Sequence, residues 1–358
     1  MKLPKKLPSF IKHLLIYFLV IGSIMIISVL IAKFGPSERN HYDDSWEEIE
    51  PFVPVTNITY DILFDQHSHT KYSDGKLTIR QSIEWHIALG FNAFAITDHN
   101  TLDNSEEIAE LAEEYKDEII VLQGMEWTTR RLHLNLIGIE EWNLKIPLTP
   151  TNEDIQATID EAHKQGGIVT ANHLLYSERS FEDITPSRKQ LMTWGVDYFE
   201  VVNGQDFDYL SYEFFLENND SISLITGTDM HSPSSSDGGK VNAWTALNVT
   251  EFSQEALMEQ LRKGETEFII DSFGVEILGT YKDNLVYDIF QPFYELGTGL
   301  IYLYLRFDKS FSPFVRIVVI VFIVYSFGIF AFIEIVMAVR NTVKLRRRKY
   351  IKNKSQTD

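Results

Sequence analysis

The sequence contains no cysteine in 358 residues. This absence excludes disulfide bonds, a thiolate nucleophile, iron–sulfur clusters and cysteine-ligated zinc. Any metal site must therefore use histidine, aspartate and glutamate side chains. Positive charge is also scarce, because 32 Lys and Arg stand against 51 Asp and Glu, which gives a formal net charge of -19. A chain with this balance is expected to repel nucleic acid and anionic lipid.

The scarce positive charge is concentrated at the two ends of the chain. Residues 1–40 carry a net charge of +5, residues 314–358 carry +7, and residues 41–313 carry -31. Each basic end also contains an uncharged apolar run, at residues 14–32 and 317–333. A helix needs about 20 such residues to cross a bilayer. We therefore predict two transmembrane helices, with their Lys- and Arg-rich flanks in the cytoplasm.

A cleaved signal peptide is the main alternative for the first apolar run. Signal peptides usually have an apolar region of only about 7–15 residues. The sequence Ile-Ala-Lys-Phe-Gly-Pro at residues 31–36 also offers no small-x-small cleavage site. These features favour an uncleaved anchor, and hence a two-pass protein of the cell membrane with an extracytoplasmic catalytic domain and both termini in the cytoplasm.

This topology divides the chain into seven expected segments. They are a basic cytoplasmic tail (1–13), a transmembrane helix (14–34), a linker (35–57), the main domain (58–283), a juxtamembrane segment (284–313), a second transmembrane helix (314–339) and a basic cytoplasmic tail (340–358).

The main domain alternates between two hydrophobic patterns. Short apolar stretches predict strands at residues 61–65, 91–97, 119–122, 134–139, 168–170, 198–202 and 223–225. Helical spacing of apolar residues predicts helices at 77–89, 105–116, 152–165 and 252–262. Strands that alternate with helices indicate a parallel α/β fold, as a barrel or an open sheet.

Histidines and acids gather where these strands end. The candidates are His67, His69, Asp74, Asp98, His99, Glu126, His133, His173, Asp229 and His231. Side chains on a strand repeat every second residue, so His-x-His and Asp-x-His each direct two ligands the same way. Taken singly, such a histidine is usually a surface residue, Asp74 could cap the next helix, and Asp98 could be a turn acid. Together they predict a site for Zn, Mn or Fe.

Several of these motifs resemble one known family. His-Ser-His-Thr-Lys-Tyr-Ser-Asp-Gly at residues 67–75 and Ile-Thr-Asp-His-Asn-Thr at 96–101 resemble the PHP (polymerase and histidinol phosphatase) superfamily of metal-dependent hydrolases. Gly-Met-Glu-Trp-Thr-Thr at 124–129, followed by His133 and Asn135, resembles its carbaryl-hydrolase-like branch. Residues 244–245 and 261–266 resemble the family's C-terminal unit. The resemblance covers roughly residues 58–275 and neither apolar run.

The resemblance implies a distorted (β/α)7 TIM-like PHP barrel, here flanked by N- and C-terminal transmembrane helices, with two or three divalent ions. By motif position, the ligands form three groups: His67, His69, Glu126 and Asp229; then Glu126, His133 and His173; then Asp74, His99 and His231. The family often has His-Pro where this chain has His173-Leu174. Arg179 is the nearest candidate for the arginine that commonly meets phosphate in this family.

A hydroxide that bridges two divalent ions is the expected nucleophile. Asp229 or His231 would then move a proton to the leaving group, and Asp98 would orient ligands. The leading prediction is a membrane-anchored phosphoesterase whose partners are a small phosphoester and the lipid bilayer. One alternative is a carboxylic or carbamate ester hydrolase that uses the same metal site, and another is a non-catalytic membrane sensor that retains the barrel. A nucleic-acid substrate is not expected, because the domain is acidic. The sequence leaves the oligomeric state open.

Overall fold

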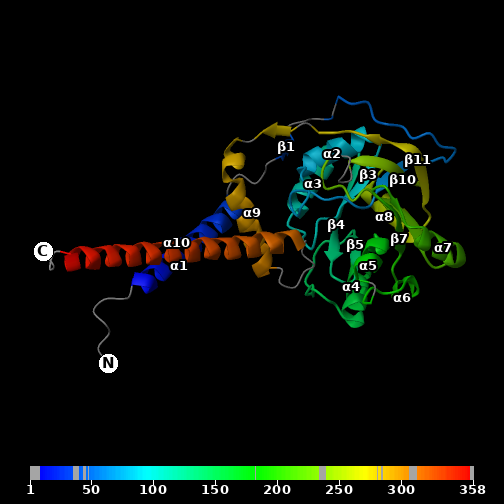
Figure 1. Cartoon of the computed structure of the whole chain (residues 1–358). Helices are drawn as coiled ribbons and strands as arrows, with labels where there is room; N and C mark the ends of the chain where they lie inside the picture. The colour runs from blue at the N-terminus through cyan, green and yellow to red at the C-terminus, as the bar shows by residue number, and fades with distance from the viewer. Residues whose placement is uncertain are drawn as a thin grey trace. The chain divides into compact units, whose positions relative to one another are not determined.

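The computed structural model describes residues 9–34, 40–42, 46, 48–181, 183–233, 239–279, 281–283, 285–305 and 313–354. The chain separates into two compact units (Figure 1). One, called here the globular unit, lies within residues 40–282. The other, the helical unit, is made from the two ends of the chain.

The globular unit contains most of the secondary structure. Its elements in chain order are β1 (Asn40–Tyr42), β2 (Ile62–Asp65), α2 (Ile79–Ala88), β3 (Ala93–Ile96), α3 (Ser105–Glu114), β4 (Ile120–Thr128), β5 (His133–Ile137), α4 (Asn152–Lys164), β6 (Ile168–Asn172), α5 (Leu174–Phe181), α6 (Arg188–Thr193), β7 (Tyr198–Asn203), β8 (Asp206–Phe207), α7 (Tyr209–Asn218), β9 (Ser223–Gly227), β10 (Lys240–Leu247), α8 (Gln254–Lys263), β11 (Glu267–Glu276) and β12 (Tyr281–Asp283).

The main sheet is mixed, where the alternation of strands and helices predicted a parallel one. Its order is β11-β10-β2-β3-β4-β5-β6-β7-β8, and β9 pairs with β7. Parallel pairing occurs in two blocks, β2-β3-β4 and β6-β7-β9. Between them, β5 runs antiparallel to both neighbours, because only four residues separate it from β4 and no crossover helix fits there.

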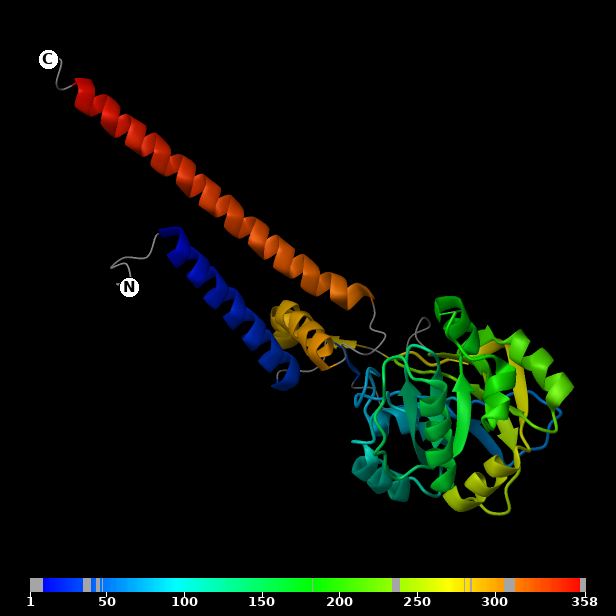
Figure 2. The same ribbon diagram turned by 90° about the horizontal axis from the view of Figure 1, so that it is seen from below.

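The sheet curls, and the segments that follow β2 and β9 meet. The backbone N–H of Asp229, just after β9, donates to the carbonyl of His67, just after β2, at 2.8 Å. His69 N–H donates to the Met230 carbonyl at 3.0 Å. Helices lie outside the curled sheet (Figure 2). The mixed α/β architecture is thus consistent with a distorted barrel.

Local sequence explains where the elements begin and end. Thr78 and Gln81 form a reciprocal capping box at the start of α2, so Thr78 and not Asp74 caps this helix. Helix α8 ends at Gly264, whose φ of 72° suits a residue without a Cβ. The strands β2 and β3 are buried along their whole length, as expected for strands covered on both faces.

Some of the unit was not predicted from the sequence. Strands β10 and β11 and helices α5, α6 and α7 had no predicted counterpart. Part of the predicted linker also packs on the core, since Trp46 is only 3% exposed and Phe52 stacks on Trp244 with ring centroids 5.5 Å apart.

The helical unit consists of α1 (Ser9–Phe34), α9 (Leu285–Leu305) and α10 (Pro313–Lys354). Two stretches, Ser9–Ala32 and Ile320–Arg347, are long and apolar enough to cross a membrane. They overlap the two predicted spans, 14–34 and 314–339, but the first begins and ends earlier and the second begins and ends later. Much of the predicted juxtamembrane segment forms α9, and residues 306–312 lie outside the described residues.

Two polar contacts join helices α1 and α10. His13 Nδ1 lies 2.6 Å from Glu334 Oε1, and Tyr17 Oη lies 3.1 Å from Ser326 Oγ. The partner number falls as the α1 number rises, so the two helices run antiparallel. Helix α9 packs on α1, where Gly297 lies so close to the Ser28 carbonyl that a side chain there would clash.

Candidate metal centre

The ends of β2 and β9 bring four of the predicted residues together. His67 and His69 are fully buried, and their Nε2 atoms lie 3.1 Å apart. Asp229 Oδ1 lies 3.3 Å from His67 Nε2 and 3.1 Å from His69 Nε2. His231 follows two residues later, and its ring stacks on that of His69 at 4.2 Å. The two short motifs therefore face each other across the curled sheet.

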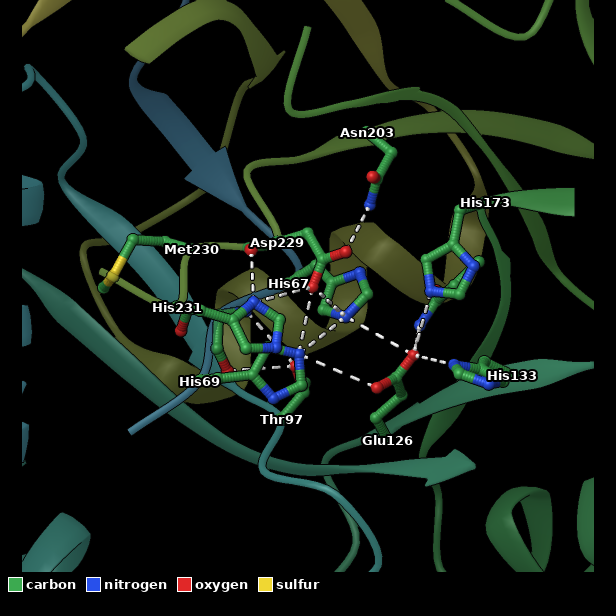
Figure 3. A network of polar contacts seen from close by, with 12 residues as sticks. His67, His69, Thr97, Glu126, His133, His173, Asn203, Asp229, Met230 and His231 are labelled. Atoms are coloured by element: carbon green, nitrogen blue, oxygen red, sulfur yellow. Dashed lines mark hydrogen bonds and ion pairs between the residues drawn. The ribbon is translucent and has the colours of Figure 1, made fainter. Parts of the chain in front are cut away.

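Glu126 lies between this group and a second pair of histidines (Figure 3). Its Oε1 is 2.9 Å from His133 Nδ1 and 3.1 Å from His173 Nε2. Its Oε2 is 2.6 Å from His99 Nδ1. Glu126 was predicted to follow a strand, but it lies inside β4, which continues to Thr128. The strand is longer than predicted because β5 pairs with its last residues.

Asp74 approaches the centre from the loop after β2. Its Oδ2 lies 3.4 Å from His99 Nε2, and its Oδ1 lies 3.3 Å from His231 Nε2. Three sets of side chains have atoms close enough to share an ion: His69, Asp74, His99 and His231; His67, His69 and Asp229; and His67, Glu126 and His173. The structure thus brings all nine predicted metal ligands into one centre, and their binding of metal stays a prediction.

The donor set fits divalent ions. The buried Nδ1 atoms of His69 and His173 have no hydrogen-bond partner among the described residues. Buried polar atoms are rarely left unpaired, and such exceptions often mark an ion or functional site. Imidazole and carboxylate donors without sulfur suit Zn, Mn or Fe.

Backbone strain is concentrated at the same place. Among the described residues, the non-glycine residues with positive φ are Asn100 (52°), His173 (28°) and Asp229 (52°). Each lies in or directly beside the centre, and such conformations cost about 1–3 kcal/mol each. The surrounding hydrogen bonds must hold them, as when Asn100 exchanges bonds with the Thr128 backbone.

Mutual charge sets the protonation of the centre. Burial would lower the pKa of His99, but Glu126 and Asp74 raise it to about 10. Burial would also lower the pKa of His231, yet Asp74 and Asp229 raise it to about 9. Burial and the nearby His231 and His99 lower the pKa of His69 to about 4. Burial would raise the pKa of Glu126, but the surrounding histidines hold it well below its usual value.

The sequence analysis missed a buried carboxylate behind the centre. Glu200, in β7, is 1% exposed, and its Oε1 lies 2.9 Å from His67 Nδ1. Its Oε2 accepts from the backbone N–H of His173 at 2.8 Å. Ligand histidines usually have such a partner on the second ring nitrogen. The available signal was a lone acid in the apolar stretch 198–202.

Asp98 and Arg179 lie at the edges of the centre. Asp98 is buried and accepts from Thr70 N and Oγ1, Ser73 Oγ and Asn104 Nδ2. These bonds hold the loop that leads to Asp74. Arg179 is exposed on α5 and lines a cavity of about 330 Å³ that also contains Glu126, Asp229 and His231. Tyr176 and Asp206 line the same cavity.

The fold and the site define an α/β domain with a histidine- and carboxylate-lined centre. Residues 65–277, more than half of the chain, match the family model described as the PHP domain. The chain therefore belongs to the PHP domain family.

Two solved structures resemble parts of this chain. A two-domain protein of Bacteroides vulgatus that contains a predicted PHP-like metal-dependent phosphoesterase superposes with a TM-score of 0.50 and 21% identity, over 68% of this chain and 73% of that one. A proposed metal-dependent phosphoesterase of Bifidobacterium adolescentis superposes with a TM-score of 0.41 and 18% identity, over 59% of this chain and 97% of that one. At 21% identity, the likeness to the Bacteroides vulgatus protein shows a similar fold and nothing further.

One curated relative also matches over a short stretch. An uncharacterised protein of Methanocaldococcus jannaschii is 40% identical over 72 residues, which is 18% of this chain and 33% of the relative. The match thus spans a third of that protein's length.

Proposed function

We propose that this protein is a membrane-anchored, metal-dependent phosphoesterase of the PHP domain family. The observation that carries the proposal is the convergence of nine histidine and carboxylate side chains in one centre beside a cavity. The family match and the phosphoesterase description of the Bacteroides vulgatus neighbour support the same activity. The resemblance to the carbaryl-hydrolase-like branch remains part of the proposal, as does the choice of Zn, Mn or Fe.

The three ligand sets would hold two or three divalent ions, with Glu126 among the ligands. Such ions supply an activated water at neutral pH and stabilise negative charge on the transferring group. The chain's own residues would do the rest. Glu200 fixes the His67 ring through Nδ1. Asn203 Nδ2 donates to Asp229 Oδ2 at 3.1 Å, so Asp229 Oδ1 is directed at His67 and His69.

A small phosphoester fits the cavity in size. The volume of about 330 Å³ is at the small end of the range for ligand pockets, which is about 300–1,000 Å³. Arg179 is proposed to contact the phosphate, since a guanidinium pairs with two phosphate oxygens at once. His231 Nδ1 donates to the Asp229 carbonyl at 2.8 Å. This bond holds the His231 ring for the proton transfer proposed for Asp229 or His231.

The test is hydrolysis by the full chain in detergent, loaded with Mn²⁺ or Zn²⁺. We expect cleavage of p-nitrophenyl phosphate or its diester, loss of cleavage after chelation, and recovery when metal returns. Arg179→Gln should raise KM for the phosphoester, whereas Asp220→Asn, a charge change outside this cavity, should not. Cleavage of naphthyl carboxylic esters without any phosphoester cleavage would favour the alternative ester hydrolase. If the metal-free protein stays inactive after each of the metals has been added, the non-catalytic membrane sensor would be favoured.

The membrane location is proposed from the two candidate spans and the basic residues that flank them. The antiparallel contacts of α1 and α10 support a topology with both termini on one side. Because the sequence has no cysteine, single cysteines can report on each side. A membrane-impermeant maleimide should label Asp117→Cys in intact cells and should not label Asn353→Cys. The reverse pattern would contradict an extracytoplasmic domain.

A further inference from the structure

A second histidine–carboxylate contact lies directly beneath the metal centre. Asp65 ends β2, is 1% exposed and stands two residues before His67. Its Oδ1 accepts from the backbone N–H groups of His67 (3.1 Å) and Thr228 (2.9 Å). Its Oδ2 accepts from Thr228 Oγ1 (2.6 Å) and from His86 Nε2 (3.0 Å).

These bonds connect the two motifs that carry candidate ligands. Asp65 holds the backbone at the start of His-x-His and also holds Thr228, the residue before Asp229. Thr228 Oγ1 also lies 3.1 Å from the carbonyl oxygen of His67. The separation of His67 and Asp229 therefore depends on where the Asp65 carboxylate lies.

His86 fixes the position of that carboxylate. It is fully buried in α2, and its Nδ1 donates to the Ser82 carbonyl at 2.6 Å. Its ring stacks on Phe94 with centroids 4.0 Å apart and planes at 20°. Both ring nitrogens face oxygen atoms, one of the Ser82 carbonyl and one of the Asp65 carboxylate. A ring held on two edges and one face has little freedom to move, and Asp65 shares that constraint.

We propose that His86 is a positioning residue for the metal centre, which acts through Asp65 on the backbone that carries His67 and Asp229. His86 contacts none of the nine candidate ligands in the described hydrogen bonds and ion pairs. The inference rests on the proposed function only in requiring that the centre bind metal. Groups that orient ligands in this indirect way typically change metal affinity by about 10–100-fold when they are replaced.

Two substitutions separate the contact with Asp65 from the rest of the His86 environment. His86→Gln can place an amide N–H where Nε2 now meets Asp65. His86→Asn reaches only as far as Nδ1, so it can keep the bond to the Ser82 carbonyl and loses the bond to Asp65. Both are polar and smaller than histidine, and the thermal unfolding measured in parallel accounts for the larger packing loss of asparagine.

A matched control exists elsewhere in the fold. His163 of α4 pairs with Asp197 at 2.8 Å, and Asp197 also accepts from a backbone N–H, that of Val169. This pair joins α4 to the N-terminal ends of β6 and β7, whereas the C-terminal ends of these strands lead into the centre. His163→Asn thus removes a similar contact that does not reach the ligands.

The experiment is a chelator competition with Zn²⁺ and Mn²⁺ on the full chain in detergent, with thermal unfolding of the metal-free protein measured in parallel. We expect His86→Asn to weaken metal binding by about 10–100-fold, His86→Gln to recover most of the loss, and His163→Asn to match wild type. Equal affinity in all four proteins would overturn the inference, as would affinities that follow thermal stability and not the contact with Asp65. Wild-type protein that binds metal but cleaves no ester would contradict the proposed function alone.

Discussion

The two units differ in how far their large apolar side chains are exposed. In the globular unit the large apolar residues Phe64 and Trp127 are fully buried, as water-driven folding requires. In the helical unit Leu19 is 71% exposed and Phe332 66% exposed, while Ser28 is buried. Helices that expose apolar side chains and bury small or polar ones suit a lipid surrounding. This difference supports the membrane location that is proposed for the helical unit.

The units also differ in how they use charge. The globular unit gathers buried acids and histidines into a single centre, where each carboxylate compensates several imidazoles. Helices α1 and α10 use isolated polar pairs along an apolar interface. A change to the centre should therefore affect metal binding, whereas a change in the helices should affect only their packing.

The largest expected effect is at Glu126. Glu126→Gln removes a charge that contacts His99, His133 and His173. Metal affinity should fall by more than about 100-fold, since even outer partners of ligands are worth about 10–100-fold. Chelator competition and activity measure the effect, with the exposed Glu118→Gln as control. Unchanged metal content would contradict the proposed centre.

The second effect is a dependence of metal binding on pH. His99 and His231, whose pKa values are raised to about 10 and 9, hold protons at neutral pH that a metal must displace. Metal affinity should rise by up to about tenfold per pH unit for each displaced proton between pH 7 and 9.

The same shifts give the opposite trend for the metal-free protein. A histidine with a raised folded-state pKa stabilises the fold fully below its unfolded value of about 6.5. That stabilisation is lost as pH rises through about 9 to 10. The midpoint temperature of thermal unfolding of the metal-free protein should therefore decrease as the pH is raised from 7 to 10. A rising midpoint would contradict this assignment of the histidine charges.

A third effect is confined to the helical unit. Gly297→Leu would force α9 away from the Ser28 carbonyl and destabilise the helix pair by about 1–3 kcal/mol. Gly328→Leu is the control, because the space around Gly328 is open. All six tryptophans lie in the globular unit. The Gly297→Leu substitution should therefore change the unfolding curve in detergent when it is followed by helical circular dichroism, and should leave the curve followed by tryptophan fluorescence unchanged. A shift in both signals would mean that the units unfold together.

The smallest effect concerns the contact between His13 and Glu334. A double-mutant cycle with His13→Leu and Glu334→Leu should give a coupling energy of about 0.6 kcal/mol, the average for polar contacts between helices in a membrane. The same unfolding assay measures it. A coupling near zero would show that the contact does not join α1 to α10.

Much of the centre could be predicted because its ligands lie close to strand ends in the sequence. His67 with His69, and Asp229 with His231, come just after β2 and β9, where an isolated parallel bridge between Ser68 and Met230 continues the pairing of the two segments. Glu126 was recognised as a candidate, although its place inside β4 depends on the pairing with β5. Glu200 and the His86–Asp65 contact were missed, since each partner lies 133 or 21 residues away in the chain.

The sequence by itself determined the local features: the apolar ends, the acidic middle, most of the strands around the centre, and the residue types that could meet a metal. These depend on composition and on spacing over a few residues. Only the tertiary structure decided that β5 runs antiparallel to both its neighbours, and that Glu200 and His86 support the centre from behind. Such contacts require the sheet to curl, and curling is the sum of many packing interactions that no short segment contains.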